Sequence, residues 1–193
     1  LNSSVSPTRA FMTDPTIDQV VQAGAASCRS LSRCNNFFVF EHSDSWLGWE
    51  NWLTVDIVRR LNHRAVVRFG AYSNGSTRSD IFLKTKQKIA VEIKVNYIDD
   101  NELDKWIGKK HGLPKRVADD LKKLTKSIRN ADRLMLMATA LESSRRSSEY
   151  RALIDEDLSS NWPKWTREWA KCGNILLLSL VIPHGANNSF KAD

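Results

Sequence analysis

The sequence is poor in cysteine and has no long apolar run. Only three of its 193 residues are cysteines (Cys28, Cys34 and Cys172), an odd number without a CxxC pair. A disulfide framework or zinc knuckle is therefore not expected. We expect a reducing environment, and so a cytoplasmic location. The best apolar stretch, Ile175 to Pro183, is less than half of the ~18 residues that a membrane span needs, so no membrane association is expected.

The chain also lacks internal repeats, low-complexity tracts and a basic-then-apolar leader. Hydrophobic residues make up 41% and charged residues 26%, which is ordinary for a globular protein. The length suits one domain with a real core. We expect a single domain over residues 13–184, a cloning remnant or linker over residues 1–12, and a flexible tail over residues 185–193.

The positive charge is concentrated in one segment. Lys105 to Arg133 contains ten basic and three acidic residues, a net charge of +7 that equals the formal charge of the whole chain. Clustered Lys and Arg are typical of a surface that binds polyanions, although a charge run alone is more often a solvated helix face.

Hydrophobic periodicity predicts the elements. A helix is expected from about residue 15 into the twenties, and another over 45–62, where Glu50, Leu53, Ile57 and Leu61 share one face. Further helices are expected over 113–130, near 148–158, and through Trp162, Trp165 and Trp169, with Gly173 just past the end. Strands are expected over 65–72, 79–84, 88–97, 133–141 and 175–182.

This order predicts an α/β fold with a mixed central β-sheet flanked by helices. The first three strands follow one another through tight turns and should be antiparallel. The crossover from residue 88 to 141 contains a helix and should add a parallel neighbour.

Two acids and a lysine are expected to meet on this sheet. Residues alternate faces along a strand, so Glu92 and Lys94 share one face of strand 88–97. If the hairpin is centred on Lys86, paired residue numbers sum to 172 and Asp80 lies opposite Glu92. Two carboxylates this close repel each other unless a cation or proton lies between them. The alternative is a structural role, in which a surface strand carries an ion pair and has an acid opposite it on the neighbouring strand.

The pattern Ser79-Asp80, eleven residues, Glu92-Ile93-Lys94 resembles the motif of the PD-(D/E)XK nuclease superfamily, with Ser79 in place of the family's proline. The order helix, three strands, helix, strand over residues 45–141 is similar to the restriction-endonuclease-like αβββαβ core. Glu50 matches the acid that many members carry on the first helix. The acid-x-Lys spacing recurs at Asp120-Leu121-Lys122, but in a helical pattern without an opposing acid, so it is not assigned to the site.

The resemblance implies a metal-dependent endonuclease that hydrolyses DNA and leaves 5′-phosphate ends. Asp80, Glu92, Glu50 and the Ile93 carbonyl would bind Mg²⁺ or Mn²⁺, and Lys94 would position water or stabilise charge on the phosphate. The basic segment would hold the phosphate backbone. The residues assigned to this contact are Lys109, Lys110, Lys115, Arg116, Lys122, Lys126 and Arg129. Of these, Lys122, Lys126 and Arg129 lie off the apolar stripe, and the sequence leaves open whether they face the strand or the solvent.

The sequence leaves two other functions open. One is a non-catalytic nucleic-acid-binding module on the same fold. The other is an interaction domain whose basic face binds an acidic partner protein, and a nuclease toxin with an acidic inhibitor would do the same. DNA is the favoured partner over RNA, a homodimer is a further alternative, and the setting (restriction, repair, phage defence or toxin) stays open.

Overall fold

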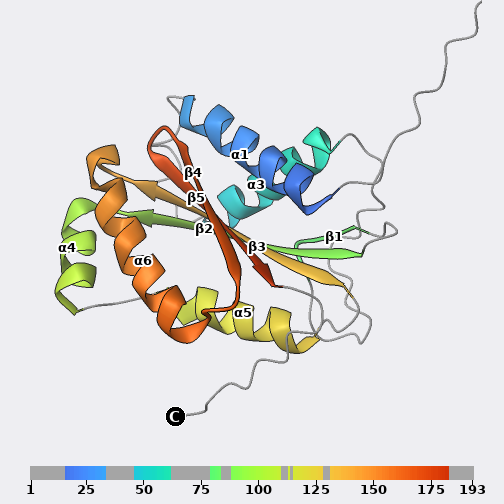
Figure 1. Ribbon diagram of the computed structural model, residues 1–193. Helices are drawn as coiled ribbons and strands as arrows, with labels where there is room; N and C mark the ends of the chain where they lie inside the picture. Colours follow the sequence, from blue (N-terminus) through green and yellow to red (C-terminus); the bar gives the residue numbers. More distant parts are fainter. Residues whose placement is uncertain are drawn as a thin grey trace, which may run out of the picture.

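The computed structural model describes residues 16–33, 46–61, 79–83, 88–109, 113, 115–127 and 131–182. Figure 1 shows their arrangement around a central sheet. The helices are α1 (Ile17–Arg33), α3 (Trp46–Arg60), α4 (Asp100–Lys109), α5 (Lys115–Ser127) and α6 (Ser147–Asn161), with a short 3₁₀ turn at Ser144–Arg146. The strands are β1 (Ile81–Leu83), β2 (Ile89–Ile98), β3 (Asp132–Leu141), β4 (Thr166–Cys172) and β5 (Ile175–Ile182). The expectations for residues 1–12, 65–72 and 185–193 lie outside the described residues.

The described strands form one mixed five-stranded sheet in the order β1-β2-β3-β5-β4. β2 and β3 are parallel, and every other neighbouring pair is antiparallel. The parallel pair is joined by a crossover that contains α4 and α5, since parallel strands cannot be joined by a tight turn. The predicted mixed α/β architecture is confirmed.

The register of the β1–β2 pair is also the predicted one. Ile81 pairs with Val91, and Leu83 pairs with Ile89, so the paired numbers sum to 172. β1 is short and ends its pairing at Ile81, so Asp80 directly precedes it beside the middle of β2.

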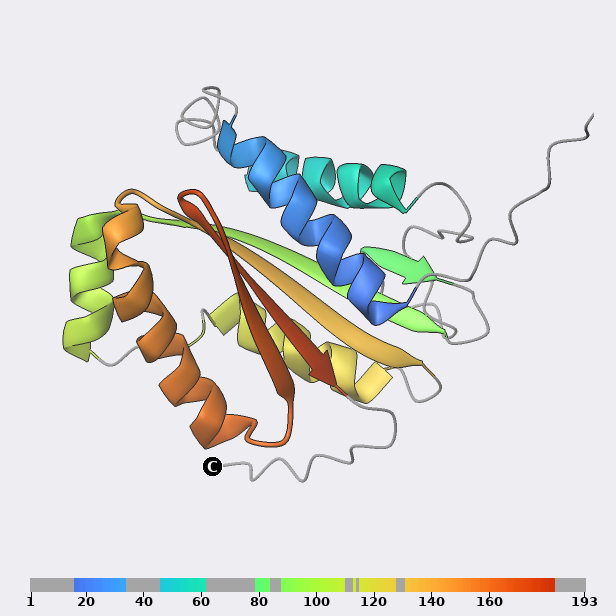
Figure 2. The same cartoon turned by 45° about the horizontal axis from the view of Figure 1, so that its top comes forward.

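Helices cover both faces of the sheet, as Figure 2 shows. One face packs against α1 and α3 and contributes alternate β2 residues, among them Val91, Ile93 and Val95. The other face packs against α4, α5 and α6 and receives Ala90. The period-two alternation of β2 therefore divides its side chains between two apolar cores.

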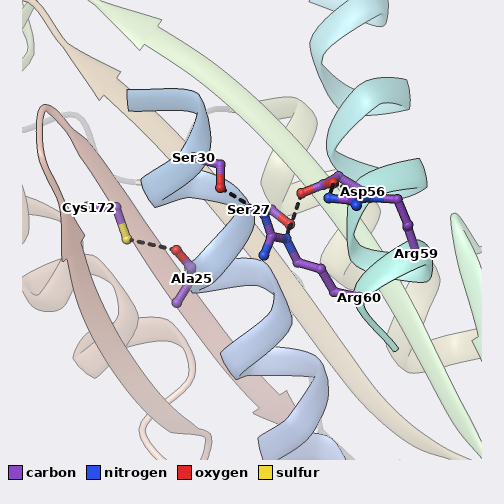
Figure 3. A network of polar contacts seen from close by, with 7 residues as sticks. All are labelled: Ala25, Ser27, Ser30, Asp56, Arg59, Arg60 and Cys172. Atoms are coloured by element: carbon purple, nitrogen blue, oxygen red, sulfur yellow. Dashed lines mark hydrogen bonds and ion pairs between the residues drawn. The ribbon is translucent and has the colours of Figure 1, made fainter. Parts of the chain in front are cut away.

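A buried polar network fastens α1 to α3 (Figure 3). The guanidinium Nε of Arg60 on α3 donates to Asp56 Oδ2 at 2.7 Å and to Ser27 Oγ on α1 at 3.0 Å. A second Arg60 nitrogen, Nη2, donates to Ser30 Oγ at 2.7 Å. Because Asp56 is buried, its carboxylate needs these donors to compensate for the water it has lost.

The prediction of a helix through Trp162, Trp165 and Trp169 is wrong. The α6 helix ends at Asn161, and β4 begins at Thr166, so Trp169 lies on a strand that pairs with β5. A two-residue turn joins β4 to β5, and its first residue, Gly173, has a φ of 69°. A glycine with positive φ serves both a helix end and a tight hairpin, so this signal was ambiguous.

Between β2 and β3 the structure has two helices, whereas the sequence pattern predicted only the second. The additional helix, α4, begins with the backbone N–H of Glu102 donating to Asp99 Oδ1 at 2.6 Å, which caps the helix. Its buried residue Leu103 packs into the core shared with α5 and α6.

Among the described residues, no helix is long and apolar enough to cross a membrane.

Candidate functional site

The site is built on the middle of β2, where two charged side chains share one face. Glu92 and Lys94 both face the α5 side of the sheet and are only 8% exposed as residues. Their neighbours in sequence, Val91, Ile93 and Val95, lie in the opposite core. Alternation along the strand thus brings a carboxylate and an ammonium group side by side in a largely buried place.

Lys94 is the centre of an ion-pair cluster that joins both helix layers to the sheet. Its Nζ lies 3.1 Å from Glu92 Oε1 and 3.2 Å from Glu50 Oε1, which belongs to α3. It also lies 3.4 Å from Asp120 Oδ2, which belongs to α5. Because α3 and α5 cover opposite faces, their acids reach Lys94 from two sides (Figure 2).

Asp80 joins the cluster through the backbone. Its Oδ2 accepts a hydrogen bond of 2.6 Å from the N–H of Ile93, one residue from both Glu92 and Lys94. The charges of Lys94, Glu50 and Asp120 all act on its carboxyl group. The structure therefore brings together the four side chains that the sequence assigned to the site: Asp80, Glu92, Lys94 and Glu50.

Burial disfavours the charged forms of the two central acids. It raises the pKa of Glu92 to about 8, with a further increase from the Asp80 charge that Lys94 opposes. It also raises the pKa of Asp80 to about 6, against the Ile93 hydrogen bond and the Lys94 charge. Burial lowers the pKa of Lys94, but the carboxylates of Glu92, Glu50 and Asp80 raise it more, so Lys94 stays an ammonium ion.

The donor set fits a hard divalent cation in its chemistry. Among the described residues, no group of three or more His, Cys, Asp or Glu side chains has the arrangement of a complete metal cage. Mg²⁺ does not need one, because it is usually held by one or two carboxylates together with water and substrate phosphate. Asp80 and Glu92 are such a pair. Burial raises the pKa of both carboxyl groups, and the Asp80 charge raises that of Glu92 further, so a cation between them would favour their charged forms.

Sequence reasoning missed Asp120, which was set aside as part of a chance acid-x-Lys match. On α5, Val117, Leu121 and Leu124 form the buried stripe, and Asp120 falls inside this stripe at the i+3 position from Val117. An acid within an apolar stripe was the signal that its carboxylate faces the sheet. For Lys122 the sequence left open a position facing the strand or the solvent, and the residue is exposed.

The predicted phosphate-binding segment covers α4 and α5. Lys109, Lys115 and Lys122 are exposed, as are Lys105 and Lys123. The side chains of Lys110, Arg116, Lys126 and Arg129 lie outside the described residues. Arg133, which contributes to the charge of the segment, is buried, and its Nη1 donates to the Thr125 carbonyl at 2.8 Å. The helices α4 and α5, which carry these exposed lysines, cover one face of the sheet (Figure 2), and Asp120 of α5 contacts Lys94 from that face.

Comparison with models of known protein families, with curated proteins and with solved structures finds no significant match to this chain. The function is therefore inferred from the cluster of Asp80, Glu92, Lys94 and Glu50.

Proposed function

We propose that this protein is a metal-dependent nuclease of the PD-(D/E)XK type that hydrolyses phosphodiester bonds of DNA. One observation carries the proposal: Asp80 and Glu92, from adjacent extended segments, converge beside the ammonium group of Lys94. The order α3, β1, β2, α5, β3 also supports the proposal, although α4 is an addition and the strand expected over residues 65–72 lies outside the described residues.

Each residue has a role that follows from its chemistry. Asp80 and Glu92 would hold the cation, with Glu50 and the Ile93 carbonyl as further oxygen ligands. When bound, Mg²⁺ or Mn²⁺ supplies Lewis acidity, which polarises a phosphate oxygen and lowers the pKa of water. Lys94 carries a positive charge beside the acid pair and would stabilise the negative charge that grows on the phosphate.

The overall reaction adds one water molecule across the phosphodiester bond. A water oxygen bonds to phosphorus, the bond from phosphorus to the 3′ oxygen breaks, and a proton passes to the departing 3′ oxygen. The products are a 5′-phosphate and a 3′-hydroxyl. The exposed lysines of α4 and α5 would hold the phosphate backbone through contacts that do not depend on base sequence.

Plasmid cleavage tests the proposal. The wild-type chain should nick or linearise DNA with Mg²⁺ or Mn²⁺ and not with EDTA, giving ends that DNA ligase can rejoin. Lys94→Met should lower the rate about 100-fold or more, as removal of one transition-state donor commonly does. Lys88→Met, which changes an exposed lysine next to the same strand, is the matched control and should stay within twofold. Equal cleavage in EDTA, or full activity of Asp80→Asn and Glu92→Gln, would overturn the proposal.

The second candidate is a non-catalytic nucleic-acid-binding module. It is favoured by the three carboxylates around Lys94, which could form a purely structural ion-pair cluster. Calorimetric titration of Mn²⁺ distinguishes the two functions. If the protein is a nuclease, the wild type should bind Mn²⁺ and Asp80→Asn should lose this Mn²⁺ binding. If it is a binding module, it should bind DNA without metal and leave the DNA uncut.

A further inference from the structure

Asp120 lies between a buried lysine and an exposed one. Its Oδ2 is 3.4 Å from Lys94 Nζ, and its Oδ1 is 2.8 Å from Lys123 Nζ. The side chain of Lys94 is 10% exposed, that of Asp120 is 18% exposed, and that of Lys123 is 61% exposed. A chain of alternating charges therefore runs from the centre of the site to the solvent side of α5.

Asp120 differs from the other two partners of Lys94. Glu92 and Glu50 belong to the group of acids that would hold a cation, so their charge is shared between two tasks. Asp120 comes from α5 and, among the described residues, forms ion pairs with Lys94 and Lys123 only. It is the carboxylate that can hold Lys94 while the other acids are engaged.

The position of Asp120 is fixed by packing. Val117, Leu121 and Leu124 are at most 1% exposed and anchor α5 against β2 and β3. Because these residues set the rotation of the helix, the carboxylate three residues after Val117 faces the sheet. A side chain fixed in this way loses little conformational entropy when it forms an ion pair.

We propose that Asp120 is a positioning residue that holds the Lys94 ammonium on the α5 side of the Asp80–Glu92 pair, and that Lys123 steadies Asp120 from outside. This inference rests on the proposed nuclease function and deepens it. It links the basic face of α5, which would bind the phosphate backbone, to the ammonium group that would meet the scissile phosphate.

Nitrogen-15 NMR of the lysine ammonium groups tests the contact directly. The Lys94 signal is identified by its loss in Lys94→Met, and its protons should exchange slowly in wild type because the group is buried and ion-paired. Asp120→Asn should shift this signal and speed its exchange several-fold. Asp119→Asn removes a charge from the same turn of α5. Because Asp119 is not among the ion-pair partners of Lys94, this variant should leave the Lys94 signal unchanged. An unchanged Lys94 signal in Asp120→Asn would overturn the inference.

Cleavage kinetics supply the functional readout. Asp120→Asn should lower kcat about tenfold or more with KM within twofold, Asp120→Glu should restore much of the loss, and Lys123→Gln should lower kcat only two- to threefold. If wild type cleaves DNA and Asp120→Asn cleaves equally well, this inference fails and the proposed function stands. If wild type cleaves no DNA with either metal, the proposed function fails and the positioning role fails with it, whatever the NMR signal shows.

Discussion

The carboxylate of Asp80 accepts a 2.6 Å hydrogen bond from the backbone N–H of Ile93, the residue between Glu92 and Lys94. This bond continues the β1–β2 pairing one step beyond Ile81 with a side chain in place of a backbone carbonyl. Asp80 therefore contributes both a hydrogen bond to the fold and a negative charge to the acidic pair. Substitutions at this position can separate these two contributions.

Asp80→Asn and Asp80→Ala should have different effects on stability. Both remove the charge, so both should weaken Mn²⁺ binding at least tenfold in calorimetry. Asparagine keeps an acceptor oxygen for the Ile93 N–H, whereas alanine leaves this donor without its partner, which costs about 1–3 kcal/mol. Urea denaturation should show the loss for Asp80→Ala alone. Equal destabilisation of the two variants would contradict the role of the hydrogen bond.

The metal-free protein should lose stability as the pH rises from about 4 to 8. Burial raises the folded-state pKa values of Asp80 and Glu92 to about 6 and about 8, above their ordinary values of 3.8 and 4.5. The folded protein therefore binds more protons than the unfolded chain in this pH range. Because of this difference, the free energy of unfolding falls as the pH increases. The total loss should be several kcal/mol, because a difference of one pKa unit between the folded and unfolded states corresponds to about 1.4 kcal/mol.

Glu92→Gln should flatten this pH dependence, because the amide does not ionise. Urea denaturation at pH 5 and pH 9 in EDTA measures the effect, and saturating Mn²⁺ should restore wild-type stability at pH 9 through its binding to the folded state. Glu156→Gln is a control on α6, outside the Lys94 cluster. A wild-type stability that rises over the same pH window would contradict the interpretation.

Exposed lysines of α5 should determine how strongly DNA binding depends on salt. The double variant Lys115→Gln/Lys122→Gln removes two exposed charges and should reduce the slope of log affinity against log salt by about 1–2. Its Mn²⁺ affinity should stay within twofold, because neither lysine takes part in the ion pairs around Lys94. Fluorescence anisotropy with a labelled duplex in EDTA measures the slope. Lys164→Gln, an exposed lysine after α6, should leave the slope unchanged if α5 is the contact surface.

The Asp56–Arg60 pair should matter for stability and not for the site. The Arg60 side chain is 27% exposed and bonds to both α1 and the buried Asp56, so Arg60→Met should cost about 2–4 kcal/mol by leaving the Asp56 charge poorly compensated (Figure 3). Arg59 also bonds to Asp56, but its side chain is 66% exposed, so Arg59→Met should cost under about 1 kcal/mol. Thermal or urea unfolding compares the two, and a larger loss for Arg59→Met would contradict this account.

The hairpin and the crossover could be predicted because their signals have a strict physical basis. Side chains alternate with a period of two along β2, so the shared face of Glu92 and Lys94 follows from position alone. The β1–β2 register follows from the midpoint of a short turn, and it placed Asp80 beside Glu92. The helical period also placed Glu50 on the same face as the buried residues Leu53 and Ile57.

Other features could not be predicted because they depend on partners that are distant in sequence. The spacing of Trp162, Trp165 and Trp169 fits a helix, but β4 gains backbone pairing with β5 and a Trp169 contact with Asp155 on α6. Tertiary pairing overrode a local pattern there. Asp120 was missed because the pairing of its carboxylate with Lys94 depends on how α5 packs against β2.

The cluster around Lys94 also has a consequence for synthesis of the protein. Its acids come from α3, β2 and α5, and the span from Glu50 to Asp120 covers more than a third of the chain. While the ribosome is still making α5, the nascent chain has a lysine and two of its three carboxylate partners. The complete set of charges assembles only after the last of these segments has emerged and packed, so no short fragment can reproduce it.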